Sequence, residues 1–337
     1  MKIIHVITSM QEAAGTTTFV ENVVKGLRQM GHEVRIVMST NELGACDLIH
    51  IHGLWSRLLH DAAAYGTAHK IPIVWSTHGM TAPWAMRHKW WKKMPAWLLY
   101  QRHDLKSAAL IHCTTELEVE WNRALGFKNC FIVPLGTQLP GTDNCPLPPD
   151  NSHTLLFVGR IYPVKGLVNL IKAWSIVNSQ LATDNWRLRV VGPDQAGHMA
   201  ELESLVRELA LCGSVEFAGP KYGTELFQEY DNCDCLVLPS FTENFGATIV
   251  DALAHGKPCI ASTFTPWREL QEYGCGWWVS NEPDKLAKAI QEMIDAGDEA
   301  RREMGSRGRK LVEEKYTWDA IVNAMVKGYE EVLNGTS

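Results

Sequence analysis

The stretch Thr154–Gly166, TLLFVGRIYPVKG, runs as an apolar strand into Gly159 and then opens a helix. The same alternation of short apolar, β-branched runs and amphipathic stretches fills the rest of this chain of 337 residues. Such alternation is typical of a mostly parallel, doubly wound α/β sheet. We predict six strands before the middle of the chain, at 2–8, 33–39, 47–52, 71–77, 110–114 and 130–134, and six after it, at 154–158, 187–191, 214–217, 235–238, 258–261 and 276–279.

A proline-rich segment divides the chain in two. Residues 140–150 contain Pro140, Pro146, Pro148 and Pro149 without any periodicity, which indicates a linker. We therefore predict a first Rossmann-like domain over 1–140, a linker over 141–152 and a second Rossmann-like domain over 153–316. Residues 317–337 carry apolar side chains at helical spacing, and we expect this final helix to pack back on the first domain.

Composition limits the function classes and the compartment. Hydrophobic residues make up 46% of the chain, and the formal net charge of −6 argues against nucleic-acid binding. The nine cysteines are scattered without zinc-ligand spacing, and free thiols suit a reducing cytoplasm. The opening MKIIHVITSM lacks the apolar core of a signal peptide, and no window reaches the roughly 18 apolar residues of a membrane span. We expect a cytoplasmic protein.

The first motif that carries chemistry is Gly159–Gly166, GRIYPVKG. In open α/β sheets, ligands bind at the carboxyl ends of strands, and Gly159 allows a sharp turn there. Arg160 and Lys165 can place a forked and a compact positive group beside one anion, such as a pyrophosphate. An ordinary turn with two solvated cations explains the same spacing equally well.

The second motif is Pro239–Gly246, PSFTENFG, which leads into a predicted helix at 247–254. Free backbone N–H groups at such a helix start favour anionic or polar oxygens, and Gly246 permits close approach. Glu243 lies in the loop and Asp251 follows about two helical turns later. The two carboxylates are too far apart to share a proton, but they can accept hydrogen bonds from two points of a polyol. The alternative makes Glu243 a charge at the helix start and Asp251 a solvated surface acid.

Together these motifs make the sequence similar to a known family. It resembles the retaining glycosyltransferases of family four, which have the GT-B architecture of two Rossmann-like domains facing across a cleft. That family carries a G-R-x4-K-G turn and an E-x7-E motif, which correspond here to Gly159–Gly166 and to Glu243 with Asp251. The second acid is usually Glu in the family, so Asp251 is one methylene shorter. The resemblance covers nearly the whole chain.

The resemblance implies roles for residues of both motifs. Arg160 and Lys165 would bind the pyrophosphate of a nucleotide-sugar donor, and Glu243 would hold hydroxyls of the donor sugar near its anomeric carbon. Asp251 would bind the ribose hydroxyls. The other residues of the two motifs that we expect to contact the donor are Gly159, Asn244, Phe245 and Gly246.

The first domain contributes two further candidates. Gly15 lies in the loop 9–18 after the first strand, where the family often has a pair of glycines near the donor phosphate. His78 follows the strand at 71–77, and the family often has a histidine there that reaches the donor sugar. His50 and His52 alternate with isoleucines, so that their side chains share one face of a strand.

The expected reaction needs no metal or other cofactor. A diphosphate is a good leaving group, and Arg160, Lys165 and helix starts can neutralise its developing charge. The resemblance implies a retaining hexosyltransferase that uses a UDP- or GDP-sugar and a saccharide or lipid-linked acceptor in polysaccharide or glycoconjugate synthesis. Two alternatives stay open: a nucleotide-sugar epimerase of the same fold, and a non-catalytic subunit that only binds a nucleotide sugar.

A basic and aromatic segment at 84–106 is the remaining unusual feature. It holds four tryptophans and six basic residues against one acid, Asp104. This combination suits a helix that lies on an anionic membrane surface, which would bring the enzyme to a lipid-linked acceptor. An equally good interpretation is a helix whose tryptophans pack on the domain while its cations face water.

Overall fold

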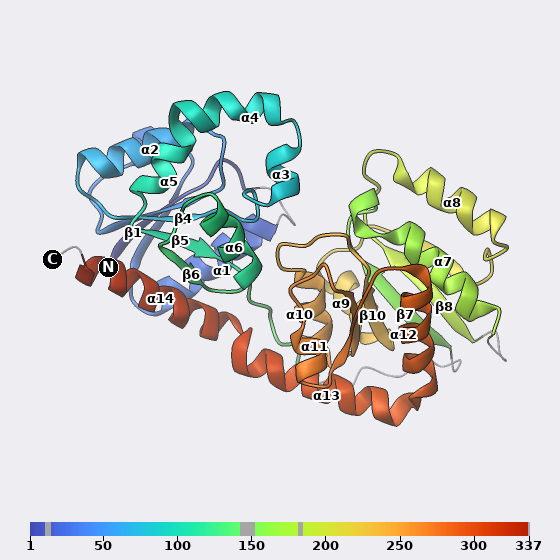
Figure 1. Ribbon diagram of the computed structural model, residues 1–337. Helices are drawn as coiled ribbons and strands as arrows, with labels where there is room; N and C mark the ends of the chain where they lie inside the picture. The colour runs from blue at the N-terminus through green and yellow to red at the C-terminus, as the bar shows by residue number, and fades with distance from the viewer. Residues whose placement is uncertain (11–14, 142–151, 181–184, 336–337) are drawn as a thin grey trace. The chain divides into compact units, whose positions relative to one another are not determined.

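The computed structural model describes residues 1–10, 15–141, 152–180 and 185–335. The chain forms two compact units: unit 1 comprises Met1–Gly136 with Trp318–Ser337, and unit 2 comprises Thr137–Thr317. Figure 1 shows α14 (Trp318–Gly335), the last helix of the chain, against the helices and sheet of unit 1. Most of the linker predicted at 141–152 lies outside the described residues.

Unit 1 is built on a parallel sheet of six strands in the order β2-β1-β3-β4-β5-β6. Buried aliphatic side chains fill both faces of these strands, as expected for a parallel sheet covered by helices. The strands are β1 (Lys2–Val6), β2 (Glu33–Val37), β3 (Leu48–His52), β4 (Ile73–Ser76), β5 (Leu110–Cys113) and β6 (Cys130–Ile132).

Helices cover both faces of this sheet. The longer ones are α1 (Gly15–Gln29), α2 (Arg57–Ala68), α6 (Glu116–Ala124) and α14, and the shorter ones are α3 (Pro83–Arg87), α4 (Trp90–Ala96), the π-helical turn Trp97–Gln101 and α5 (Arg102–Ser107). α1 and α14 share one hydrophobic core with the sheet. A Cβ at Gly26 would lie 2.5 Å from Val322, so this glycine permits the close approach of α1 and α14.

Unit 2 repeats the architecture with a parallel sheet in the order β12-β11-β10-β7-β8-β9. Its strands are β7 (His153–Val158), β8 (Trp186–Val191), β9 (Val215–Gly219), β10 (Cys235–Leu238), β11 (Cys259–Ser262) and β12 (Gly276–Val279). Its helices are α7 (Leu167–Asn178), α8 (His198–Glu208), α9 (Gly223–Asp231), α10 (Ala247–Ala254), α11 (Glu269–Glu272), α12 (Pro283–Asp295) and α13 (Gly297–Lys315).

The predicted fold class is confirmed, and all twelve predicted strands occur with ends that differ by at most two residues. In each sheet the strand order reverses beside the unit's first strand. The reversal lies between β1 and β3 in unit 1, and between β7 and β10 in unit 2. Ligands of open α/β sheets bind outside the carboxyl ends of the strands at such a switch point. None of the helices in the described ranges is both long and apolar enough to cross a membrane.

Candidate functional site

The two motifs of unit 2 meet at its switch point. The turn Gly159–Gly166 follows β7 and the loop Pro239–Gly246 follows the neighbouring strand β10. The backbone N–H of Phe241 donates to the carbonyl of Val164 at 2.8 Å, which joins the loop to the turn. Gly166 has a φ of 73°, and a Cβ there would lie 2.1 Å from the carbonyl oxygen of Pro239. Only glycine therefore fits where the turn crosses the loop.

An ion pair links the same two segments. Nζ of Lys165 lies 2.5 Å from Oε1 of Glu243, and both side chains are largely buried, with exposed fractions of 14% and 13%. The hydroxyl of Ser240 donates to the same carboxylate oxygen at 2.7 Å. A charged pair so far removed from water is held in one geometry by these contacts. The structure therefore brings a cation and a carboxylate together at the switch point.

Arg160 lies apart from this pair. Its side chain is exposed and donates from Nη1 to Oε1 of Gln195 at 2.7 Å. The structure thus places the two cations of the first motif differently. Lys165 forms an ion pair with Glu243, whereas Arg160 is exposed and accessible to an anion. Their joint binding of one pyrophosphate stays a prediction.

The end of the loop is anchored by an aromatic cluster. Phe245 is buried against Trp267 and Tyr316, and the indole N–H of Trp267 donates to the carbonyl of Phe245. Gly246 then takes a φ of 84° directly before α10. The aromatic cluster fixes where the backbone N–H groups at the start of α10 point. Asn244 is half-buried in the same loop.

Asp251 on α10 is not a solvated surface acid, so that interpretation is wrong. Its Oδ1 accepts a hydrogen bond of 2.6 Å from the hydroxyl of Thr137. Burial raises the pKa of Asp251 to about 6, and the bond from Thr137 partly opposes this effect. Oδ2 has no partner among the described residues. One oxygen of this carboxylate therefore remains to accept a bond from a ligand hydroxyl.

His78 of unit 1 lies directly beyond the end of β4 in a strained conformation. Its φ is 48°, which is uncommon for a residue other than glycine. The buried Glu118 of α6 holds both neighbours of His78: its Oε1 accepts from the hydroxyl of Thr77 and from the backbone N–H of Gly79, each at 2.6 Å. Sequence reasoning missed Glu118, although Thr115-x-x-Glu118 at the start of α6 has the capping-box pattern.

His78 is one of five neighbouring histidines. His50 and His52 of β3 are buried on one face, as their alternation predicted, but the sequence analysis missed His5 of β1 and His112 of β5. Each is a single histidine inside an apolar strand, and the recurrence of this pattern is the sequence signal that could have identified them. Gly15 is exposed at the start of α1, and residues 11–14 of its predicted loop lie outside the described residues.

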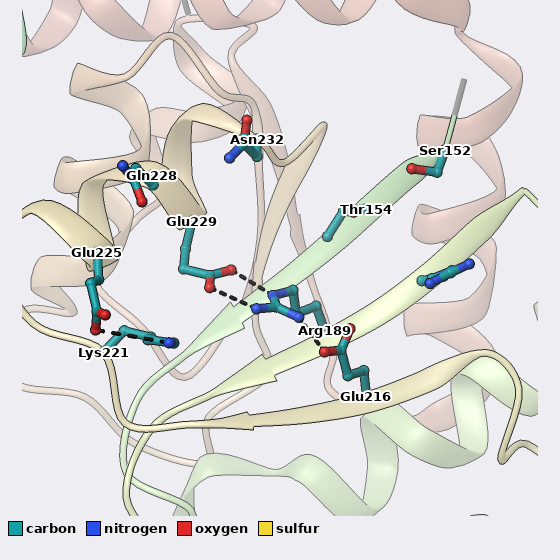
Figure 2. A pocket seen from close by; sticks show the side chains of 10 residues that line it. Ser152, Thr154, Arg189, Glu216, Lys221, Glu225, Gln228, Glu229 and Asn232 are labelled. Carbon is teal, nitrogen blue, oxygen red and sulfur yellow. Dashed lines mark hydrogen bonds and ion pairs between the residues drawn. The ribbon is translucent and has the colours of Figure 1, made fainter. Parts of the chain in front are cut away.

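Unit 2 also contains a polar pocket of about 420 Å³, shown in Figure 2, which holds none of the predicted site residues. Arg189 lies in it and pairs with Glu229 through two bonds, of 2.6 and 2.8 Å, and with Glu216. Thr154 and Arg187 line the pocket near the amino ends of β7 and β8. The pocket therefore lies near the amino ends of the strands, whereas the two motifs lie at their carboxyl ends.

Both units match known glycosyltransferase families in sequence. Residues 144–311 match the family described as glycosyl transferases group 1, and residues 42–136 match the glycosyl transferase 4-like domain. An uncharacterized glycosyltransferase of Methanocaldococcus jannaschii is 32% identical over 219 residues, which cover 64% of this chain and 50% of that protein. D-inositol 3-phosphate glycosyltransferase of Kineococcus radiotolerans is 31% identical over 201 residues, covering 55% of this chain and 46% of that protein. The matches span about half the length of these curated relatives.

Among solved structures, HepE of Anabaena in complex with UDP resembles this chain with a TM-score of 0.77 at 18% identity. The superposition covers 98% of this chain and 100% of that chain. At this level of identity the likeness shows a common fold, with two Rossmann-like domains.

Proposed function

We propose that this chain, which has the GT-B fold and matches the group 1 glycosyl transferases over residues 144–311 and the glycosyl transferase 4-like domain over residues 42–136, transfers a sugar from a UDP- or GDP-sugar to a saccharide or lipid-linked acceptor. Transfer retains the anomeric configuration of the donor, and the product serves polysaccharide or glycoconjugate synthesis. The observation that carries this proposal is the Lys165–Glu243 pair at the switch point of unit 2.

In this proposal unit 2 binds the donor and unit 1 binds the acceptor. Arg160 and Lys165 bind the diphosphate and neutralise the charge that develops on it as the leaving group departs. Glu243 orients the sugar by accepting hydrogen bonds from its hydroxyls. Cationic side chains and helix starts then supply what a metal ion supplies in other transferases, so that the reaction proceeds without one.

The nucleoside part of the donor is assigned to α10. Oδ2 of Asp251 accepts a hydrogen bond from a ribose hydroxyl, while Thr137 occupies Oδ1. Backbone groups of Phe245 and Gly246 contact the sugar or the phosphates at the start of the helix. The solved structure of HepE in complex with UDP has a related fold, which supports a nucleotide ligand here.

Titration with nucleoside diphosphates tests the donor assignment. We expect UDP or GDP to bind, and Arg160→Ala and Lys165→Ala each to weaken binding about tenfold or more, because a hydrogen bond to a charged group contributes about 1.5–3 kcal/mol. Isothermal titration calorimetry measures this. Lys172→Ala removes an exposed cation from α7 and should leave affinity unchanged. If both motif variants bind like the wild type, the pyrophosphate site lies elsewhere.

We also propose that the segment 84–106 contacts an anionic membrane surface. Trp84, Trp90 and Trp91 are exposed by more than half, and Leu98 and Leu99 by 73% and 80%. Trp97 is the tryptophan of this segment that packs on the domain. The exposed cations among them are Arg87, Lys89, Lys92, Arg102 and Lys106. Apolar side chains beside cations match the acyl boundary and headgroups of anionic lipid.

A further inference from the structure

Three imidazoles form a line in unit 1 from the sheet core to the loop after β4. Nδ1 of His5 lies 2.9 Å from Nε2 of His52, and Nδ1 of His52 lies 3.1 Å from Nε2 of His78. His5 and His52 are buried, whereas His78 is half-buried. The inner end of the line is the buried Nε2 of His5, which has no hydrogen-bond partner within the described ranges. The outer end is Nδ1 of the half-buried His78.

All three rings are neutral near pH 7. Burial is the main cause that lowers their pKa values, to about 3 for His5, to about 4 for His78 and well below the ordinary value for His52. Each nitrogen–nitrogen contact then holds one proton, and two arrangements satisfy both contacts. In one arrangement all three rings carry the proton on Nε2, and in the other all three carry it on Nδ1. The other charged or titratable groups that face the line are Arg28, His50, His112 and Glu118.

The inner end of the line selects one arrangement. With the protons on Nε2, His5 would bury an N–H group without an acceptor, and such orphaned donors are rarer than under-used acceptors. The arrangement with the proton on Nδ1 of every ring leaves no such buried donor, so the inner end of the line favours it.

The other two histidines of the cluster have the opposite tautomer. Nε2 of His112 lies 2.7 Å from the carbonyl oxygen of Val133, so Nε2 carries the proton and Nδ1 accepts from the hydroxyl of Ser76 at 2.7 Å. The single proton of Ser76 is then used, so His50 must donate from Nε2 to Ser76 at 2.7 Å. Nδ1 of His50 accepts from the hydroxyl of Tyr329 at 2.6 Å.

We propose that His78 is a neutral hydrogen-bond donor through Nδ1, fixed in that tautomer by the positioning residues His5 and His52. Its partner is an oxygen of the sugar substrate, so this part of the inference rests on the proposed function. His78 does not act as a base, because moving a proton inward along the line would leave a buried cation on His5. Glu118 fixes the backbone on both sides of His78 and so sets the direction of the Nδ1–H group.

Nuclear magnetic resonance of the full chain with ¹⁵N-labelled histidine tests this tautomer directly. Two-bond ¹H–¹⁵N correlations at pH 7 report which ring nitrogen carries the proton. We expect the proton on Nδ1 in His5, His52 and His78, and on Nε2 in His50 and His112 of the same protein. A proton on Nε2 of His78 overturns the proposal. So does a metal ion bound in stoichiometric amount, since His5, His50 and His52 lie close enough to ligate one.

Two substitutions at the inner end separate positioning from packing. In His5→Leu, His52 loses the group that donates to its Nε2, so we expect His78 to show a mixture of tautomers and kcat to fall about tenfold. In His5→Asn, the side-chain amide can still donate to His52, so the Nδ1–H signal of His78 and most of kcat should return. Ser76→Ala breaks the other network and should leave the His78 signal unchanged.

Equal spectra and equal kcat in His5→Leu and the wild type would overturn the positioning role. The spectra are recorded without substrate, so they decide the tautomer even if the chain transfers no sugar. Failure of the proposed function would appear separately, as no turnover of any nucleotide sugar by the wild type.

Discussion

Glu243→Gln is expected to lower kcat by about 10²–10³ while the affinity for the nucleoside diphosphate stays within a few-fold. The amide keeps the shape of the carboxylate but removes the charge that Lys165 and Ser240 now hold in place. In the proposed site this carboxylate binds the hydroxyls of the transferring sugar rather than the base or the ribose. Rates at saturating donor measure kcat, and calorimetry measures the affinity of the free nucleotide.

Glu229→Gln is the matched control for this substitution. Glu229 is also a carboxylate of unit 2 in an ion pair, with Arg189, but it lies in the pocket near the amino ends of β7 and β8 (Figure 2). This variant should lose stability and keep kcat. An unchanged kcat in Glu243→Gln, or an equal loss in both variants, would remove Glu243 from the reacting site.

Substitution of exposed cations in the segment 84–106 is expected to weaken membrane binding strongly. We expect the wild type to co-sediment with anionic vesicles at low salt and less with neutral ones, because each cation near an anionic surface contributes about 1 kcal/mol. Replacing Arg87, Lys89 and Lys92 with Gln should therefore weaken binding about a hundredfold if the contributions add. Lys93 is left intact, since its ammonium group donates to the carbonyl of Ala85 within the segment.

The salt dependence and a matched variant check the specificity of this effect. Binding should fall with added salt, because surface attraction is screened over roughly 10 Å at 0.1 M. The exposed tryptophans should leave a remainder that salt does not remove. Replacing Lys285, Lys288 and Lys310 of unit 2 with Gln changes the net charge equally and should leave binding intact. A wild type that ignores anionic vesicles at low salt contradicts the membrane proposal.

The strands could be predicted because parallel strands buried on both faces leave continuous apolar runs in the sequence. The two motifs could be placed at strand ends for the same reason. Their contact could not, since it depends on β10 lying beside β7. The Lys165–Glu243 pair joins residues 78 positions apart, and the bond from Thr137 to Asp251 joins residues 114 apart.

The histidine line shows the same limit in unit 1. His50 and His52 could be placed on one face from their alternation, but the contact of His52 with His5 needs β1 beside β3, and its contact with His78 needs the end of β4 beside β3. The order of the strands in the sheet is a property of the folded protein and is not visible in the local sequence. Exposure of the tryptophans was likewise undecided by the sequence, because a helix that packs on the domain and one that faces lipid share the same periodicity.

Transfer of a sugar from a nucleotide donor with retention is tested most directly by the stereochemistry of the product. Proton nuclear magnetic resonance of the wild type with a UDP- or GDP-sugar and saccharide acceptors, in the presence of EDTA, follows donor and product together. We expect the first product to have the anomeric configuration of the donor sugar, and its formation to require the acceptor. An inverted product, an altered nucleotide sugar formed without acceptor, or an untouched donor would contradict it.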